Sequence, residues 1–499
     1  MQPFSQHAPE DCAAASGPLP TVDRRWLLGM MAAYALLLLA FYPPIYTSID
    51  EASAFSMAYV LRHGTIYPSH VRMFHDAEFF AGLSPSGPHG RVYRFPIGFP
   101  LLLAGLSWAG WRTFFLVNPL LHLTATWCFA RILPLCRVPP RYAVLYLLLP
   151  SFVLFTRTLF SDAFAASLTT IGLYFLVCRR MPLATGLCLG LALTARSASV
   201  FVTLILLAAA LGADWRRGDV PLWRGQAARI ALGLAPFVLL NLVYNFYALG
   251  SPLTSAYNVQ ALSWQGLKQS GGIYALSLLL VYPALLLAPW LYRGPLWKEG
   301  LAATTLVFLV AAAYNESTYG NNFLQTLLST PRQVLPVMPF YLLAYCGLAA
   351  RLPWPAGRRR TVLEGLAAAA LLLTAAIVSE RHQAYLQSLR VLSAQISHAL
   401  PPGSTVYANK DAYKLHQPIW DARPYRMLPV VSEAQCAADL KRGPVYAVLY
   451  VRSRGFAGED ELNAGVLRDL RARFLLQPAS VSGAAQVQCY RVLGTTPRH

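Results

Sequence analysis

The sequence predicts an all-α polytopic membrane protein of about 11 transmembrane helices, followed by a small α/β C-terminal domain outside the cytoplasm. Three observations predict this class. The 499 residues are 56% hydrophobic and 13% charged, with a mean hydropathy of +0.43, whereas a soluble domain carries about 25% charged residues. Apolar runs of about 17–25 residues, the length of a membrane span, recur up to residue 379. Polar residues become frequent only in the tail. A cytosolic multidomain enzyme and a disordered chain are therefore excluded.

The apolar runs predict eleven spans, several of them short. They lie at 26–45, 114–134, 141–156, 162–178, 182–195, 197–213, 227–248, 273–292, 299–314, 334–350 and 361–379. The two spans that flank Arg196 could equally form a helical hairpin that does not fully cross. Residues 1–25 are expected to be a cytoplasmic leader and not a cleaved signal peptide, because they are polar and no A-x-A site follows closely.

The net charge of +19 is explained mainly by topology. Cytoplasmic loops of membrane proteins collect Lys and Arg. With the N-terminus inside, the predicted inner connections hold 17 of these residues, and the short outer loops hold 4, namely Arg157, Arg196, Lys268 and Arg332. This asymmetry predicts the orientation and leaves no reason to infer nucleic-acid binding.

One apolar run is predicted not to span the membrane. Residues 97–110, IGFPLLLAGLSWAG, follow Pro96 and are too short to cross a bilayer as a regular helix. Counting this run as a span would also invert the orientation of every later loop. We therefore expect it to lie on the membrane surface, within a long first outer loop at 46–113.

The tail at 380–499 is predicted to be a periplasmic α/β domain. The segments VYAVLYV (445–451) and VQCYRVL (487–493) are typical of strands, and Glu459 to Phe474 of a helix. Cys436 and Cys489 both fall in this domain, and an oxidising compartment favours a disulfide between them. The alternative is two buried free thiols. The eight cysteines show no spacing typical of a zinc site.

Acidic residues at the outer ends of helices are the candidate catalytic groups. Asp50 and Glu51 follow the first span, and Asp162 opens the fourth. A carboxylate at this boundary could take a proton from an acceptor hydroxyl as a general base. The structural alternative is helix capping, by Ser48 or Asp50 at the first site and by Ser161 or Asp162 at the second.

Three arginines at the same predicted face are candidate phosphate ligands. Arg94 precedes the interfacial run, Arg196 lies at the tip of LALTARSASV, and Arg332 lies in STPRQVLP. Arginine suits bidentate phosphate contact, although each could instead be a snorkelling side chain that anchors a helix end. Beside hydrophobic walls they predict a site for a lipid phosphate. The central turns of the spans contain no Asp, Glu or Lys, which argues against an ion-coupled transporter.

Six motifs follow one another along the chain. They are the Asp50-Glu51 pair, YRFPIGFPLLLAG (93–105), Asp162, LALTARSAS (191–199), NFYALGSPLTSAYN (245–258) and PRQVLPVMPF (331–340). Their order resembles that of the GT-C superfamily of integral-membrane glycosyltransferases, in the branch of protein O-mannosyltransferases and lipid A aminoarabinose transferases. Tyr93 and Tyr257 fall in these motifs and are further donor-binding candidates.

The resemblance implies an enzyme that transfers a sugar, with inversion, from a polyprenyl-phosphate donor to an extracytoplasmic glycan, lipid or protein. Asp50 would be the general base, Glu51 and Asp162 would orient the acceptor or the base, and arginines would stabilise the leaving phosphate. Here Arg94-Phe95-Pro96 stands where Lys-Pro-Pro or Tyr-Pro-Pro is common.

Metal use varies across the superfamily, so a divalent cation stays an option. The histidines of the first loop lack ligand spacing, and no obligatory metal or cofactor is expected; these are His63, His70, His75 and His89.

The expected location is the bacterial inner membrane, with the active site facing the periplasm. Two alternatives to the transferase predict other sequence features. A flippase or other transporter of lipid-linked sugars would be expected to show a polar mid-membrane cavity and an internal repeat. An O-antigen-ligase-like transferase would place its functional loop late in the chain, whereas the longest predicted loop between spans is the first.

Overall fold

The computed structural model describes most of the chain, in two compact units. The described residues are 19–43, 45–46, 48–67, 86–88, 90–93, 96–216, 220–254, 263–313, 323–353, 358–409, 412, 423–428, 431–450, 459–479 and 487–496. The helical unit comprises Met1–Tyr42, Phe95–Phe246 and Tyr257–His382, and the second unit comprises Pro43–Arg94, Tyr247–Ala256 and Gln383–His499.

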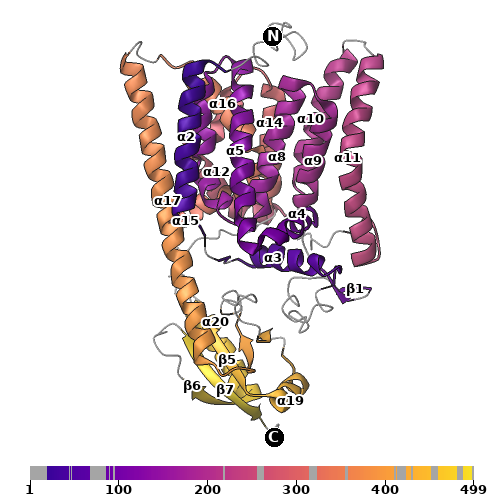
Figure 1. Ribbon diagram of the computed structural model, residues 1–499, viewed down its shortest axis with the longest axis vertical. Coiled ribbons are helices and arrows are strands. Elements are labelled where there is room, and N and C mark those ends of the chain that lie inside the picture. The colour runs from indigo at the N-terminus through magenta and orange to yellow at the C-terminus, as the bar shows by residue number, and fades with distance from the viewer. Residues whose placement is uncertain are drawn as a thin grey trace. The chain divides into compact units, whose positions relative to one another are not determined.

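Helices build the first unit (Figure 1). Its α-helices are α2 (Thr21–Ala40), α4 (Gly98–Leu106), α5 (Phe114–Ile132), α6 (Val144–Leu147), α7 (Pro150–Thr156), α8 (Ser161–Tyr174), α9 (Pro182–Ala195), α10 (Ser199–Arg216), α11 (Val220–Leu249), α12 (Trp264–Val281), α13 (Ala288–Leu291), α14 (Trp297–Ala313), α15 (Phe323–Ser329) and α16 (Met338–Ala349). The 3₁₀ segments include η8 (Pro140–Ala143) and η11 (Thr330–Val337), and η9 (Phe175–Arg179) is a short π-helix. The long helix α17 (Arg358–Ala399) contributes residues to both units.

The chain is an integral membrane protein. Among the described residues, four helices are long and apolar enough to cross a bilayer, namely Trp111–Cys136, Ser161–Arg179, Gly225–Leu249 and Arg359–Ala399. A fifth candidate, Trp264–Val281 with Leu285–Leu291, is bent by 103°. The total of eleven spans stays a prediction.

Prolines interrupt two of the predicted spans. Residues 141–156 form η8, α6 and α7 instead of one helix, and α7 begins at Pro150. The predicted span 273–292 bends after α12, where Pro283 follows Tyr282. Proline lacks the N–H that an interior helical residue donates, and its ring disfavours the α conformation of the residue before it.

Helix α8 lies at the centre of the helical unit. Its apolar window is 83% buried, whereas those of the α11 and α17 spans are 17% buried. Figure 1 shows α5, α8, α9 and α11 side by side. Helices α9 and α11 approach closely at glycines, because a Cβ added at Gly186 would lie 2.2 Å from the Ile230 carbonyl oxygen. Small residues allow such contacts between helices in membranes.

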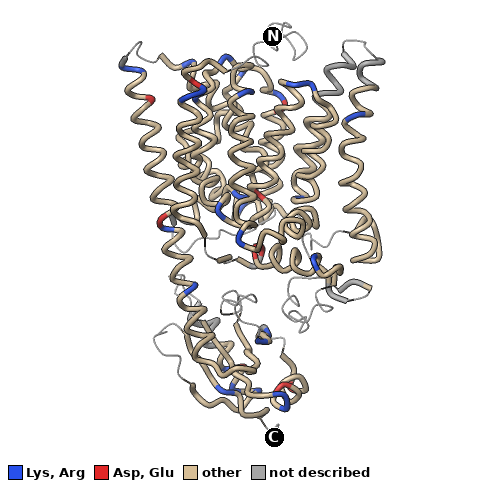
Figure 2. Tube along the Cα trace, viewed as in Figure 1, with Lys and Arg blue, Asp and Glu red and all other residues tan. Residues whose placement is uncertain are grey.

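Basic residues gather at one end of the helical unit. Figure 2 shows Lys and Arg along the upper ends of these helices, and a smaller group of basic and acidic residues toward their lower ends. This is the kind of asymmetry from which the orientation was predicted. The run at 97–110 contains the short helix α4 and a 3₁₀ turn at Ser107–Ala109. These are shorter than a regular membrane span, and their place on the membrane surface stays a prediction.

The second unit holds a mixed sheet of order β4-β3-β5-β7-β6. Strand β3 is parallel to β4 and β5, whereas β7 is antiparallel to β5 and β6. These elements confirm the α/β character predicted for the tail, including both predicted strands and the helix near 459–474. The elements are α3 (Ile49–Arg62), β1 (Ser86–Gly87), β2 (Gly90–Arg91), β3 (Thr405–Ala408), β4 (Tyr425–Met427), α19 (Glu433–Arg442), β5 (Val445–Tyr450), α20 (Glu459–Arg473), β6 (Phe474–Ala479) and β7 (Val487–Thr495). The predicted domain boundary at 379/380 lies inside α17.

The disulfide predicted between Cys436 and Cys489 is wrong, because both cysteines are free and buried. Cys436 packs beside Tyr407 on the sheet face that bears Ala447. Cys489 pairs with Val448, the residue after Ala447. Successive strand residues point to opposite faces, so the sheet separates the two sulfur atoms. The alternative of two buried thiols is correct.

Candidate functional site

A buried carboxylate opens the central helix of the helical unit. Asp162 lies in the first turn of α8, and its residue is only 1% exposed. Helix α8 begins after Phe160, which is extended, and its N-terminus has no side-chain cap. The capping alternative for Asp162 is therefore wrong, and its carboxylate has other partners.

Two arginines from distant segments converge on this carboxylate. The Nε atom of Arg196 lies 2.8 Å from Asp162 Oδ1, and the Nε atom of Arg332 lies 3.7 Å from Asp162 Oδ2. Arg196 follows the last residue of α9 in an extended conformation, and Arg332 lies in η11. Three helix ends therefore meet at one carboxylate. We call Asp162, Arg196 and Arg332 the Asp–Arg cluster.

The Asp–Arg cluster carries an excess positive charge in a nearly dry environment. Arg196 is 8% exposed and Arg332 is 3% exposed, and together they bring two positive charges to the single negative charge of Asp162. The Arg332 guanidinium lies 4.7 Å from the centre of the Phe160 ring, and Arg196 donates to the side-chain oxygen of Gln333. Low polarity strengthens charge interactions. Two buried guanidinium groups that come together in this way can donate hydrogen bonds to an anion such as a phosphate.

A glycine contact supports the position of Arg196. A Cβ added at Gly98, the first residue of α4, would lie 2.1 Å from Thr194 Oγ1 and 2.9 Å from the Thr194 carbonyl oxygen. Thr194 is buried near the end of α9, two residues before Arg196. The absence of a side chain at Gly98 thus lets α4 pack directly against the chain that carries Arg196.

Asp50 and Glu51 belong to the second unit, where they start α3. Ser48 is the N-cap, since its hydroxyl accepts from the Glu51 N–H at 3.1 Å. The Glu51 carboxylate accepts in return from the Ser48 N–H at 3.2 Å, which completes a capping box. Glu51 is 2% exposed, whereas Asp50 is partly exposed. The capping alternative thus accounts for Glu51 and leaves Asp50 as the accessible carboxylate.

The remaining predicted ligands are placed only in part. Tyr93 belongs to the second unit and is 2% exposed. Arg94 and Tyr257 lie outside the described residues. Within the described ranges, no three His, Cys, Asp or Glu side chains gather as they would around a metal ion.

Sequence reasoning missed two residues that shape the Asp–Arg cluster. Gln333 directly follows Arg332, and Phe160 lies two residues before Asp162. Their closeness in sequence to the charged residues was a usable signal. The pairing of Gln333 with Arg196, however, depends on the approach of η11 to the end of α9, which no local pattern shows.

These features define an integral membrane protein with a buried, net-cationic cluster where helix ends meet. No protein-family model and no curated protein matches the sequence. The fold is similar to that of ArnT from Cupriavidus metallidurans. The apo crystal structure of ArnT superposes with a TM-score of 0.57 at 12% identity, covering 94% of this chain and 98% of that one.

A second structure of the same protein, bound to undecaprenyl phosphate, gives a TM-score of 0.54 at 12% identity, covering 93% and 98% of the two chains. At 12% identity this similarity concerns the fold alone, and it agrees with the fold that the predicted resemblance implies.

Proposed function

We propose that this protein is an inverting glycosyltransferase that moves a sugar from a polyprenyl-phosphate donor to an acceptor outside the cytoplasm. The observation that carries the proposal is the Asp–Arg cluster, in which two buried guanidinium groups share one carboxylate. Two guanidinium groups at one site suit hydrogen bonding to the oxygens of a lipid phosphate. The similar fold of ArnT, which binds undecaprenyl phosphate, supports this choice of ligand.

In the proposed reaction the acceptor oxygen bonds to the anomeric carbon while the bond from that carbon to the phosphate oxygen breaks. The bonding electrons leave with the polyprenyl phosphate, and the acceptor proton passes to a base. Arg196 and Arg332 would bind the phosphate and stabilise the charge that develops on it. Asp50 would be the general base, because its carboxylate is partly exposed in the first turn of α3.

The other predicted site residues receive narrower roles. Both oxygens of Asp162 face arginines, so we assign it to positioning Arg196 and Arg332. Glu51 stabilises the helix that carries Asp50. Tyr93, Arg94 and Tyr257 stay proposals as donor ligands.

We also propose the bacterial inner membrane as the location, with the active site and the C-terminal domain in the periplasm. The support is the distribution of Lys and Arg over the predicted loops. A glycan, a lipid or a protein would each provide the acceptor hydroxyl that the reaction needs.

The test separates phosphate binding from chemistry. Native mass spectrometry of the purified protein with undecaprenyl phosphate measures binding. Arg196→Gln and Arg332→Gln should each weaken it about 10- to 100-fold, the loss expected for a hydrogen bond to a charged group. Asp50→Asn should bind as the unaltered protein does. Arg112→Gln, at an exposed arginine, is the matched control.

Transfer is followed in a deletion strain that carries each variant, by mass spectrometry of lipid-linked sugars and envelope glycans. The strain without the gene, and the strain with Asp50→Asn, should accumulate a donor and lack one sugar. Full transfer by Asp50→Asn would contradict the general-base role. Unchanged phosphate affinity in both arginine variants would contradict the binding role.

A further inference from the structure

A second cluster of cations lies in the helical unit, around the turn between α13 and α14. Arg293 and Lys298 both lie near the Trp297 ring, with the Arg293 guanidinium carbon 4.9 Å and the Lys298 Nζ atom 5.6 Å from its centre. The Arg351 guanidinium carbon lies 5.4 Å from the centre of the Tyr292 ring. Glu299, in the first turn of α14, is the acidic residue next to Lys298 in the sequence. The three cations therefore outnumber the carboxylate.

Packing and hydrogen bonds hold this turn in place. Tyr292 is 2% exposed, and a Cβ added at Gly347 of α16 would lie 2.3 Å from its ring. Arg293 Nη1 donates to the carbonyl oxygens of Trp290 and Tyr292, at 2.6 and 2.9 Å. The guanidinium of Arg293 is thus held in place before any ligand arrives, which lowers the entropic cost of binding.

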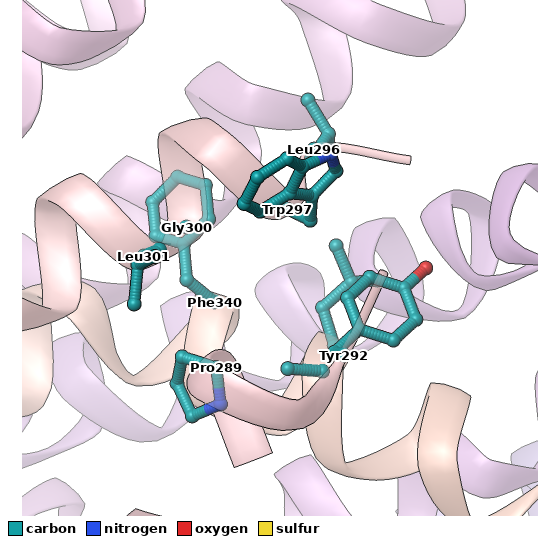
Figure 3. A pocket seen from close by; sticks show the side chains of 9 residues that line it. Pro289, Tyr292, Leu296, Trp297, Gly300, Leu301 and Phe340 are labelled. Carbon is teal, nitrogen blue, oxygen red and sulfur yellow. The ribbon is translucent and has the colours of Figure 1, made fainter. Parts of the chain in front are cut away.

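Apolar surface adjoins these cations. Figure 3 shows the side chains that line a small pocket between α13, α14 and α16, with Trp297 on one side and Phe340 on another. The pocket has a volume of about 10 Å³, room for about one water molecule. Exposed apolar side chains lie close to the pocket in the sequence: Leu287, Trp290 and Leu291 are 47%, 53% and 61% exposed. Exposed leucines next to Trp and Arg are typical of the membrane–water boundary.

We propose that this turn binds an anionic phospholipid of the surrounding membrane. Arg293, Lys298 and Arg351 contact its phosphate, and its acyl chains lie along Leu287 and Leu291. The excess of cations selects an anionic headgroup over a zwitterionic one, and the exposed leucines select a lipid over a free phosphate ion. Basic pockets beside membrane helices recognise anionic lipids by the same chemistry. This site is independent of the Asp–Arg cluster and of the proposed transferase activity.

The experiment is native mass spectrometry of the full chain in detergent, titrated with phosphatidylglycerol or phosphatidylcholine. The unaltered protein should retain phosphatidylglycerol preferentially. The double variant R293Q/K298Q should bind it about 30-fold more weakly, at roughly a fivefold to sixfold loss per cation. The control R24Q/R25Q removes the same charge from exposed arginines of α2 and should bind normally.

Three results would overturn the proposal: equal retention of both lipids, an unchanged affinity in R293Q/K298Q, or an equal loss in both double variants. Displacement of the lipid by millimolar inorganic phosphate would do so as well, because it would show that the ion alone suffices. If R293Q/K298Q elutes as an aggregate, R351Q replaces it. R351Q leaves the turn itself unaltered, and normal phosphatidylglycerol binding by R351Q would then count against the site.

Discussion

Replacement of Asp162 by asparagine would leave two buried guanidinium groups without the carboxylate that they share. Asp162 is 1% exposed, with one guanidinium nitrogen at 2.8 Å and another at 3.7 Å. At an effective dielectric constant of about 20, unit charges about 4 Å apart attract by about 4 kcal/mol. Removal of one partner from a buried ion pair costs about 3–5 kcal/mol. We therefore expect Asp162→Asn to destabilise the helical unit by about 3–5 kcal/mol.

The assay is thermal unfolding in detergent, followed by tryptophan fluorescence. A loss of this size should lower the Tm by roughly 5–10 °C. Glu380→Gln is the control, because Glu380 also lies 3.6 Å from an arginine nitrogen, but its side chain and that of Arg381 are 54% and 82% exposed. An exposed pair contributes about 0–1 kcal/mol. If Asp162→Asn melts like the control, the carboxylate does not hold the arginines, and the reasoning is refuted.

Three further predictions concern buried residues. Gly98→Ala should destabilise the helical unit by about 1–3 kcal/mol, as overpacking does, because the new Cβ would lie 2.1 Å from Thr194 Oγ1; an unchanged Tm would contradict the contact. Burial raises the pKa of the Cys489 thiol from 9.0 to about 11, so the folded state holds its proton longer than the unfolded chain does. The contribution of the protonated thiol to the free energy of unfolding should therefore be complete below pH 9 and lost as the pH rises toward 11. Urea titrations at several pH values measure this dependence, which should weaken in Cys489→Ala. Cys436 and Cys489 should both be alkylated after unfolding without a reductant, whereas a disulfide-linked peptide would contradict the separation of the two thiols.

The sequence predicted the residues of the Asp–Arg cluster but not their relationship. Asp162, Arg196 and Arg332 were singled out because charged residues at the ends of apolar runs are conspicuous. For Asp162 alone, helix capping was the more common explanation. The choice required knowledge of which helix ends meet, and in the structure those ends come from α8, α9 and η11. For Glu51, by contrast, the structure favours capping. Its partner Ser48 is only three positions away, so this interaction could be predicted from the local sequence.

For Cys436 and Cys489 as well, the sequence predicted the local structure, whereas the tertiary structure decided whether the two residues meet. The sequence placed both in one α/β domain and predicted the strand that holds Cys489, since alternation of apolar residues is a local signal. Whether two thiols can meet depends on the faces to which they point, and hence on register. The pairing of Cys489 with Val448, opposite the face that Cys436 contacts, decided against the disulfide.

By itself, the sequence determined that this chain is a membrane protein with a polar α/β tail, because hydropathy and periodicity are properties of neighbouring residues. The proline interruptions near residues 150 and 283 could also have been predicted, since proline acts on its own helix. Only the tertiary structure decided that two arginines share Asp162 and that Gly98 admits α4 beside Thr194. Those contacts join segments far apart in the chain, and their energies arise only when packing removes the charged groups from water.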